Sequence, residues 1–442
     1  AISAGVFGTL SGELTLLVLT STAANVSPTG LVRLTMTPNV TLPPSRQQLG
    51  ETCYVAGGSL SSYDGAAIVE HGFPLYPEGV QVTVNGAGTG AVTDGVHQIV
   101  VIYEWVDNAG QRHQGAPSPA VQVTAATGAN SGSFTVRVPT LLLSQKTNIQ
   151  VVAYMTQAGG IIFNRVLLDN GVYAPVLNTT AANIVTLTID DSDASIAGNE
   201  LLYNQPNQAG TTLANIAPGP VSVLGTAHGR LWFAKPDRPG EVGFSQEYIT
   251  NVGLQCTPDL GVTLPLDAGA PVAIMALDEK VVLLTSRKVF VVYGTGPTPS
   301  GSFNNYSAPQ EIPSDVGCSD GRSVLRVPSG IIFKATKGWH LLGRDLTVQY
   351  VGGGAARWDG SAVTSAVLME NVAECRFTTD DGVTLVYDYR HNQWSYFQKT
   401  LGLSYVPVDA VWWPTAGNGA GRYVHISLAN GLNQENPGVY TD

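Results

Sequence analysis

The sequence contains little charge, and its balance is acidic. Charged residues make up 12% of the 442 residues, about half of the roughly 25% usual for soluble domains. Lys and Arg number 22 against 33 Asp and Glu, and no run of basic residues occurs. Because a protein that grips nucleic acid needs a basic patch for the phosphates, this composition argues against stable nucleic-acid binding. It is typical of a surface covered by partner subunits, although a secreted β protein rich in Ser, Thr and Asn would look similar.

Long apolar runs are also missing. No stretch approaches the roughly 18 apolar residues that span a bilayer, so we expect no membrane insertion. The chain starts at Ala1-Ile2-Ser3, which carries neither Met nor a basic segment and is not a signal peptide. Residues 437–442 stop in mid-pattern, so we expect the chain to be part of a longer protein.

Residues that bind metals or form disulfides are few and scattered. The four cysteines lie far apart without a CxxC pair, and we expect buried, reduced thiols on strands. They are Cys53, Cys256, Cys318 and Cys375. The seven histidines never pair at i, i+2 or i, i+4, so metal binding has no local support. The sequence therefore predicts no metal and no cofactor.

What the sequence does contain is a repeat. Five short apolar runs each follow a turn-prone or charged pair, and their first residues are spaced 50, 50, 52 and 40 apart. The runs are Leu231–Phe233, Val281–Leu283, Ile331–Phe333, Val383–Leu385 and Tyr423–His425. After the first four, a second β-rich run follows within about a dozen residues.

This repeat predicts a β-propeller. A period near 50 with several short strands per unit is typical of propeller blades, which stack radially because one sheet cannot cover both its own faces. Helical repeats of similar period are the alternative. They do not fit, because the runs are short, rich in Val, Ile and aromatic residues, and interrupted by Gly, Pro or Asp-Gly. We expect at least five blades and little helix.

The repeat is interrupted by a second β-rich region. Six or seven short strands lie between Val92 and residue 195, and without helical periodicity they predict a β-sandwich of immunoglobulin or fibronectin type. The expected organisation is an N-terminal propeller segment (1–91), the inserted sandwich (92–195), a linker (196–220) and the main propeller blades (221–442). The fold class is therefore all-β.

One motif could indicate an enzyme. Residues 378–385 fit the "Asp box" of sialidase-like propellers, except that Leu385 replaces an aromatic residue. We expect Asp380 to bond the backbone of its own turn and Gly382 to supply a left-handed residue, a structural role. The acidic cluster at 190–193 lacks the glycine and the distal Glu of a calcium loop, and a solvated turn is expected there. With no Gly-x-Ser-x-Gly elbow either, the sequence predicts no catalytic residues and no enzyme.

Several short motifs resemble one known family. In the first segment and the insert they are Ala56-Gly57-Gly58-Ser59-Leu60, Tyr63-Asp64-Gly65, Glu70-His71-Gly72-Phe73-Pro74, Tyr103-Glu104-Trp105-Val106-Asp107 and Ala116-Pro117-Ser118. In the blades they are Gly229-Arg230-Leu231-Trp232-Phe233, Gly243-Phe244-Ser245 and Val289–Pro297. From about Gly57 to Asp442 the chain resembles the tail hub or nozzle proteins of short-tailed bacteriophages, often called tail stabilisation or tail tubular protein B.

The resemblance implies a structural virion protein without catalytic residues. In that family a propeller carries an inserted sandwich, and six copies form a ring around the DNA ejection channel below the portal and adaptor. Expected partners are the chain itself as a homohexamer, portal or adaptor, tail fibre or spike proteins, and genome DNA that passes without tight binding. The expected location is the phage tail of the virion, after assembly in the host cytoplasm. A lumen that lets DNA slide should be acidic or neutral, with the basic residues mostly away from its axis.

The alternative is a secreted or cell-surface propeller that binds glycans or acts as a sialidase. It is motivated by the Asp box and by the tryptophans Trp339, Trp358, Trp394, Trp412 and Trp413. Exposed tryptophans stacked in one pocket would favour this alternative. Tryptophans buried between blades would favour the tail protein.

Overall fold

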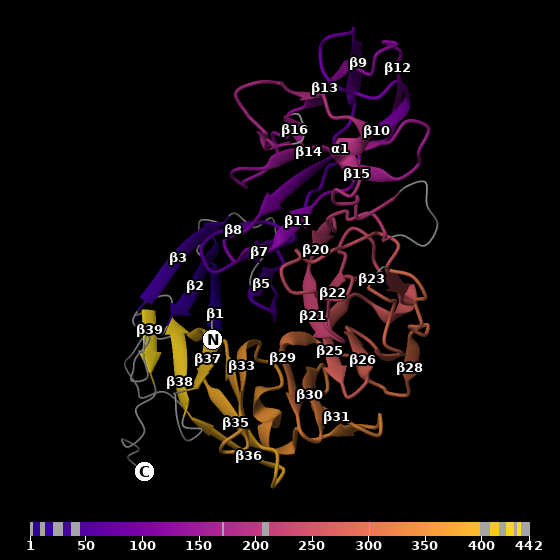
Figure 1. Ribbon diagram of the computed structural model, residues 1–442. Helices are drawn as coiled ribbons and strands as arrows, with labels where there is room; N and C mark the ends of the chain where they lie inside the picture. Colours follow the sequence, from indigo (N-terminus) through magenta and orange to yellow (C-terminus); the bar gives the residue numbers. More distant parts are fainter. Residues whose placement is uncertain are drawn as a thin grey trace.

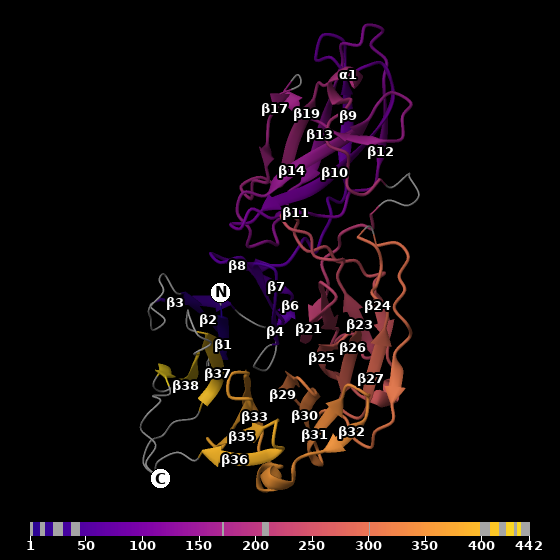
Figure 2. The same ribbon diagram turned by 60° about the horizontal axis from the view of Figure 1, so that its bottom comes forward.

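The computed structural model describes residues 3–8, 14–20, 30–36, 45–169, 172–205, 212–299, 301–397, 407–414, 421–427 and 431–434. The described strands form a ring of seven sheets and, at one side of it, two packed sheets whose sequence is inserted into that of the ring (Figures 1 and 2). The predicted fold class, a β-propeller with an inserted β-sandwich, is confirmed.

Each sheet of the ring is one antiparallel blade of three or four strands. Blade 1 consists of β1 (Ser3–Gly8), β2 (Leu14–Thr20) and β3 (Gly30–Met36). Blade 2 consists of β4 (Arg46–Leu49), β5 (Thr52–Val55), β7 (Ser61–Tyr63) and β8 (Ile68–Glu70). Blade 3 consists of β21 (Val223–Ala227), β22 (Arg230–Ala234), β23 (Glu241–Phe244) and β24 (Gly261–Thr263). Blade 4 consists of β25 (Pro271–Leu277), β26 (Lys280–Thr285), β27 (Val289–Tyr293) and β28 (Gln310–Ile312). Blade 5 consists of β29 (Asp320–Val327), β30 (Gly330–Ala335), β31 (Gly338–Gly343) and β32 (Val348–Tyr350). Blade 6 consists of β33 (Val363–Met369), β34 (Glu374–Thr379), β35 (Thr384–Asp388) and β36 (Gln393–Phe397). Blade 7 is β37 (Pro407–Pro414), β38 (Gly421–Ser427) and β39 (Gly431–Gln434).

The first strand of each blade lies nearest the axis of the propeller. These inner strands meet in succession: β4 with β21, then β25, β29, β33, β37 and finally β1. Glycine makes the approach possible at two places. A Cβ at Gly225 of β21 would lie 2.4 Å from the carbonyl oxygen of Ile274 in β25, and one at Gly321 of β29 would lie 2.5 Å from that of Val272. Ala at either position would push neighbouring blades apart.

Apolar clusters fill the spaces between successive blades, as the burial argument for the repeat requires. Trp232 and Phe244 of blade 3 pack with Val281 and Phe290 of blade 4. Equivalent clusters join blades 2 and 3, 4 and 5, 5 and 6, and 6 and 7. Each blade thus stabilises its neighbours rather than forming a core of its own.

One of the five predicted repeat positions was wrong. Four of the runs lie on the second strand of a blade, β22, β26, β30 or β38, but Val383–Leu385 reaches onto β35, a third strand. The second strand of blade 6 is β34, and the second strands therefore begin 50, 50, 44 and 47 residues apart, from Arg230, Lys280, Gly330, Glu374 and Gly421. The turn before β35 contains Asp381-Gly382 and looks the same in sequence as the turns before the second strands, so local chemistry could not distinguish them.

The insert is a two-layer sandwich between blades 2 and 3. One layer is β9 (Gln81–Asn85), β13 (Ser133–Pro139) and β19 (Ile184–Ile189). The other is β10 (Gly95–Val106), β11 (Arg112–Gln114), β12 (Val121–Ala125), β14 (Gln150–Thr156), β15 (Phe163–Arg165) and β18 (Val176–Leu177). A shared apolar core that includes Ile99, Phe134, Val151 and Leu187 lies between the layers.

The start of the insert differs from the predicted boundary at Val92. β9 pairs with β13, so the sheets of the insert include residues well before Val92. The sequence did not reveal β9 because it is an edge strand with few buried positions. At the other end, the predicted linker ends in β20 (Pro220–Val221), which pairs with β6 (Gly58–Ser59). Residues 206–211 of that linker lie outside the described residues.

The remaining elements are short. They are β16 (Leu168–Asp169), β17 (Val172–Tyr173), the four-residue helix α1 (Asp193–Ile196) and the 3₁₀ turns η1 (Leu266–Ala268) and η2 (Gly353–Trp358). Within the described part of the chain, no helix has the length and apolar character to cross a membrane.

Candidate functional site

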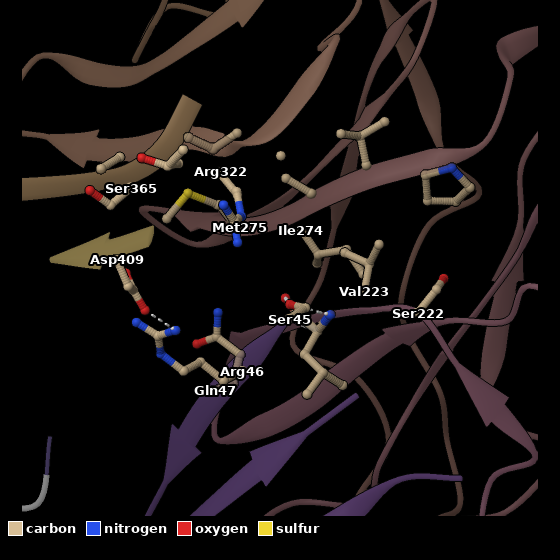
Figure 3. A pocket seen from close by; sticks show the side chains of 18 residues that line it. Ser45, Arg46, Gln47, Ser222, Val223, Ile274, Met275, Arg322, Ser365 and Asp409 are labelled. Carbon is tan, nitrogen blue, oxygen red and sulfur yellow. Dashed lines mark hydrogen bonds and ion pairs between the residues drawn. The ribbon is translucent and has the colours of Figure 1, made fainter. Parts of the chain in front are cut away.

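The candidate site is a cavity of about 540 Å³ between the inner strands of the propeller; Figure 3 shows the side chains that line it. Six inner strands or the residues just before them contribute to its wall, from blades 2 to 7. The seventh inner strand, β1, has the uncharged sequence Ser-Ala-Gly-Val-Phe-Gly. The charged side chains that line the cavity are Arg46, Arg322 and Asp409. Each of them lies within the first three residues of its inner strand.

An ion pair joins two sides of this cavity. The guanidinium of Arg46 on β4 lies 2.6 Å from a carboxylate oxygen of Asp409 on β37, drawn as a dashed line in Figure 3. Burial lowers the pKa of Arg46, but the Asp409 carboxylate more than compensates and the pKa is raised overall. Arg46 therefore stays charged beside its partner carboxylate.

Arg322 on β29 has no comparable ion pair within the described part of the chain. Its backbone N–H donates to Asp320 Oδ1 at 3.1 Å, while Asp320 Oδ2 accepts from the Val363 N–H of β33 at 2.7 Å, so the strand start is held in place. Among the described residues, its guanidinium makes no hydrogen bond or ion pair. Burial lowers the pKa of Arg322, an effect that the carboxylates of Asp409 and Asp320 partly offset. This guanidinium is the cation of the cavity wall that has no ion pair among the described residues.

A second polar group beside it also lacks a partner. Ser365 on β33 lines the cavity and is 3% exposed, and its hydroxyl is buried without a hydrogen-bond partner among the described residues. Unpaired buried hydroxyls are rare in folded proteins, because each costs the desolvation of a polar group. Much of the remaining wall is aliphatic and includes Val223, Ile274 and Met275. The cavity thus combines donors for an anion with apolar surface.

A nearly uncharged surface covers the outer side of the insert. The residues that point away from the sandwich core on β9, β13 and β19 carry one charge among them. This outer face consists of Gln81, Thr83, Arg137, Pro139, Ile184, Thr186 and Thr188, all exposed. Gln81, Arg137 and Thr186 lie side by side in one cross-strand row. Such a face can contact another protein without the cost of removing many charges from water.

The Asp box proves to be a turn between β34 and β35, and the predicted contact of Asp380 is wrong. Asp380 accepts from the Ala362 N–H at 3.0 Å, in the loop that precedes the blade, instead of bonding its own turn. Asp381 instead accepts from the Thr379 hydroxyl. Gly382 has a φ of +83°, which confirms the left-handed position. The motif thus fixes a turn to the neighbouring loop.

The tryptophans do not form an exposed platform. Trp339 is fully buried and Trp358 is 8% exposed, and both belong to the cluster between blades 5 and 6. Trp394 packs against that cluster, and Trp412 packs against the one between blades 6 and 7. The side chain of Trp413 lies outside the described residues. The feature on which the glycan-binding alternative depended is therefore missing from the described side chains.

Two other expectations about reactive groups can be compared with the structure. All four cysteines are free and buried, as predicted, and burial raises the pKa of Cys256, Cys318 and Cys375 to about 12. The acidic cluster is not a solvated turn, because Asp191 is buried and accepts from the Leu167 N–H at 3.0 Å. In the described part of the chain, no three His, Cys, Asp or Glu side chains are grouped to hold a metal ion.

Sequence reasoning missed the residues that line the cavity. Arg46, Arg322, Ser365 and Asp409 lie on four different blades, and none has a distinctive local motif. The only signal available was position, since each lies near the start of an inner strand. That signal becomes useful only when the strands and their order around the axis are known.

Comparisons with known proteins found distant similarity to several solved structures. No family model matches the chain, and no curated protein matches it. Among solved structures, it is similar to Hsv2 of Kluyvelomyces marxianus, with 10% identity over 68% of this chain and 71% of that chain and a TM-score of 0.33. It is also similar to YCF48 bound to D1 peptide (11% identity, 64% and 77% covered, TM-score 0.32) and to a chain of the mitotic checkpoint complex (11%, 68% and 83%, TM-score 0.31).

Proposed function

We propose that the chain is a structural subunit of a bacteriophage tail hub, or nozzle, and has no catalytic activity. Six copies close into a ring around the DNA ejection channel, below the portal or adaptor and in contact with tail fibre or spike proteins. The observation that supports this proposal is the order of elements. Two blades come first, then the sandwich, then five blades, and the motifs quoted from the sequence resemble a family with this order.

The outer face of the insert supports contacts between copies. A closed ring needs a surface on each subunit that fits a different surface on the next, so that no interface is left unpaired. The outer face is exposed and carries Arg137 as its one charge. Large apolar side chains are also exposed elsewhere on the insert, among them Leu142, Leu143, Ile161 and Leu177. We assign the outer face to the neighbouring copy.

Electron microscopy and native mass spectrometry of the purified chain test the assembly. The expected result is a ring of six copies, whereas a monomer at every concentration tested would contradict the proposal. The double variant Gln81→Lys with Thr186→Lys places two further positive charges in the row of Arg137 and is expected to abolish the ring. The matched control is Gln310→Lys with Gln349→Lys, which adds the same charges to exposed positions on β28 and β32 and should leave the ring intact.

DNA binding tests the role of the channel separately. Because DNA must slide, the inner wall of the assembled ring should not carry clustered Lys and Arg, and affinity for duplex DNA at physiological salt should be weak. A filter-binding or anisotropy titration measures this. Tight binding whose affinity falls steeply with added salt would count against a conduit and in favour of a nucleic-acid clamp.

A further inference from the structure

We propose that the cavity between the inner strands of the propeller binds a small organic anion. Its oxyanion group contacts Arg322 and Ser365, and its apolar body contacts the aliphatic wall. This inference does not depend on the tail-hub proposal, because the cavity lies within one chain.

The cavity wall has more positive than negative side chains. The cavity wall carries two guanidinium groups and one carboxylate, and the Arg46–Asp409 pair accounts for one of each. Arg322 is left over, and the seventh inner strand brings no charged residue that could neutralise it. The Arg322 side chain is partly buried, and a carboxylate or phosphate offers two parallel hydrogen bonds to its planar fork. An oxyanion is therefore the ligand that this side chain fits.

The hydroxyl of Ser365 is a second candidate donor at this wall. It comes from the neighbouring inner strand, β33, and β29 and β33 are in extensive contact. Its oxygen is buried and has no partner among the described residues, so it is available to donate to the same oxyanion. We propose that this hydroxyl and the partly buried Arg322 guanidinium, on adjacent strands, share one acceptor.

The size and the aliphatic wall of the cavity indicate what the rest of the ligand is. A volume of about 540 Å³ lies in the range of roughly 300–1,000 Å³ common for sites of small organic molecules. An inorganic anion alone would leave Val223, Ile274 and Met275 without apolar contact. Asp409 is paired with Arg46, so Arg322 is the cation of the wall that has no ion pair among the described residues. These features select an anion with a short apolar chain.

Calorimetric titration of the purified full chain tests the proposal, with hexanoate, hexyl phosphate and inorganic phosphate as probes. We expect hexanoate or hexyl phosphate to bind at least tenfold more tightly than inorganic phosphate, and the stronger of the two identifies the head group. Arg322→Gln should weaken that binding at least tenfold. The control is Arg326→Gln, four residues along the same strand, where the side chain is exposed and outside the cavity.

Thermal unfolding separates a ligand site from a structural role. Without ligand, Arg322→Gln should unfold at the same temperature as the unmodified chain or higher, because it removes a partly buried charge that has no ion pair among the described residues. With saturating hexanoate or hexyl phosphate, the unmodified chain should become the more stable of the two. The proposal is overturned if neither organic anion binds, if inorganic phosphate binds equally well, or if Arg322→Gln lowers the unfolding temperature equally with and without ligand.

Discussion

The contacts between blades differ from the contacts between the propeller and its insert. Between blades the buried groups are mainly apolar, as in the cluster around Trp339, Phe377 and Leu385. At the insert, Val69 and Phe73 join the apolar core of the sandwich, and polar and charged groups are buried beside them. Lys146 is fully buried there, and its ammonium donates to Glu70 Oε1 at 2.7 Å and to the Gly72 carbonyl at 2.8 Å.

Further polar contacts continue this junction. The Arg112 N–H donates to the Asn251 carbonyl at 3.1 Å, and the Gly253 N–H donates to the Arg112 carbonyl at 2.8 Å, so a strand of the insert is bonded to a loop of blade 3. The His71 ring donates through Nε2 to the Leu254 carbonyl at 2.8 Å. Apolar packing supplies most of the free energy of folding, whereas directional hydrogen bonds fix one orientation. The comparison indicates that the blades stabilise the chain and that the junction sets the position of the insert.

The largest loss of stability is expected when an apolar side chain packed between two blades is removed. Trp339→Ala removes a fully buried ring that lies 4.3 Å from Phe377, centroid to centroid, and should lower the free energy of unfolding by about 3–5 kcal/mol. Urea unfolding followed by circular dichroism measures the change. The control is Leu266→Ala, because this side chain is 79% exposed and its loss should cost no more than about 0.5 kcal/mol. Equal losses in both variants would contradict the packing described between blades 5 and 6.

The next effect is expected at the junction. Lys146→Met leaves Glu70 and two backbone carbonyls without their buried donor and should destabilise the chain by about 2–3 kcal/mol. Hydrogen exchange should show the loss first in residues near Glu70 and Ser144. Lys288→Met is the control, since Lys288 also has two carboxylate partners but lies at the surface, and no measurable change is expected. A junction that tolerates Lys146→Met as well as Lys288→Met would show that the ion pair does not hold the insert.

The junction should also make stability depend on pH. Burial, with a smaller effect from the nearby His113, lowers the pKa of His71 to about 3 from its usual 6.5. The unfolded chain therefore binds a proton between pH 6.5 and 3 that the folded chain does not. Stability is fully present above pH 6.5 and is lost as the pH falls, by about 2 kcal/mol between pH 7 and 5. In His71→Gln, urea midpoints measured over this range should fall less steeply, and an unchanged slope would exclude His71 as the cause.

The smallest effect is expected at the Asp box of blade 6. Asp380→Ala removes one hydrogen bond to the Ala362 N–H and should cost about 1 kcal/mol or less. Assays with sialosides, other glycosides and peptidoglycan should detect no turnover with either form of the chain. A hydrolysis that is present in the unmodified chain and absent in the variant would make the enzyme the better hypothesis.

The sequence by itself determined the class of fold and many of its strands. Apolar residues that recur near every 50 positions, with turn residues between them, leave stacked sheets as the way to bury them. Strands such as Leu14–Thr20 and Ile184–Ile189 are rich in apolar residues and Thr, a composition that suits a short strand. Local patterns failed where different strands share the same turn chemistry, as at Val383–Leu385, and where an edge strand such as β9 has few buried positions.

Only the tertiary structure decided which polar residues meet. Arg46 and Asp409 are separated by most of the chain, and they form an ion pair because closure of the ring brings blades 2 and 7 to the same axis. Arg322 and Ser365 meet for the same reason, on the adjacent inner strands β29 and β33. Lys146 is an ordinary loop lysine in the sequence, and it is buried because the insert folds back onto Glu70. Contacts of this kind depend on long-range geometry, whereas the spacing of apolar residues that predicts strands is a local property of the chain.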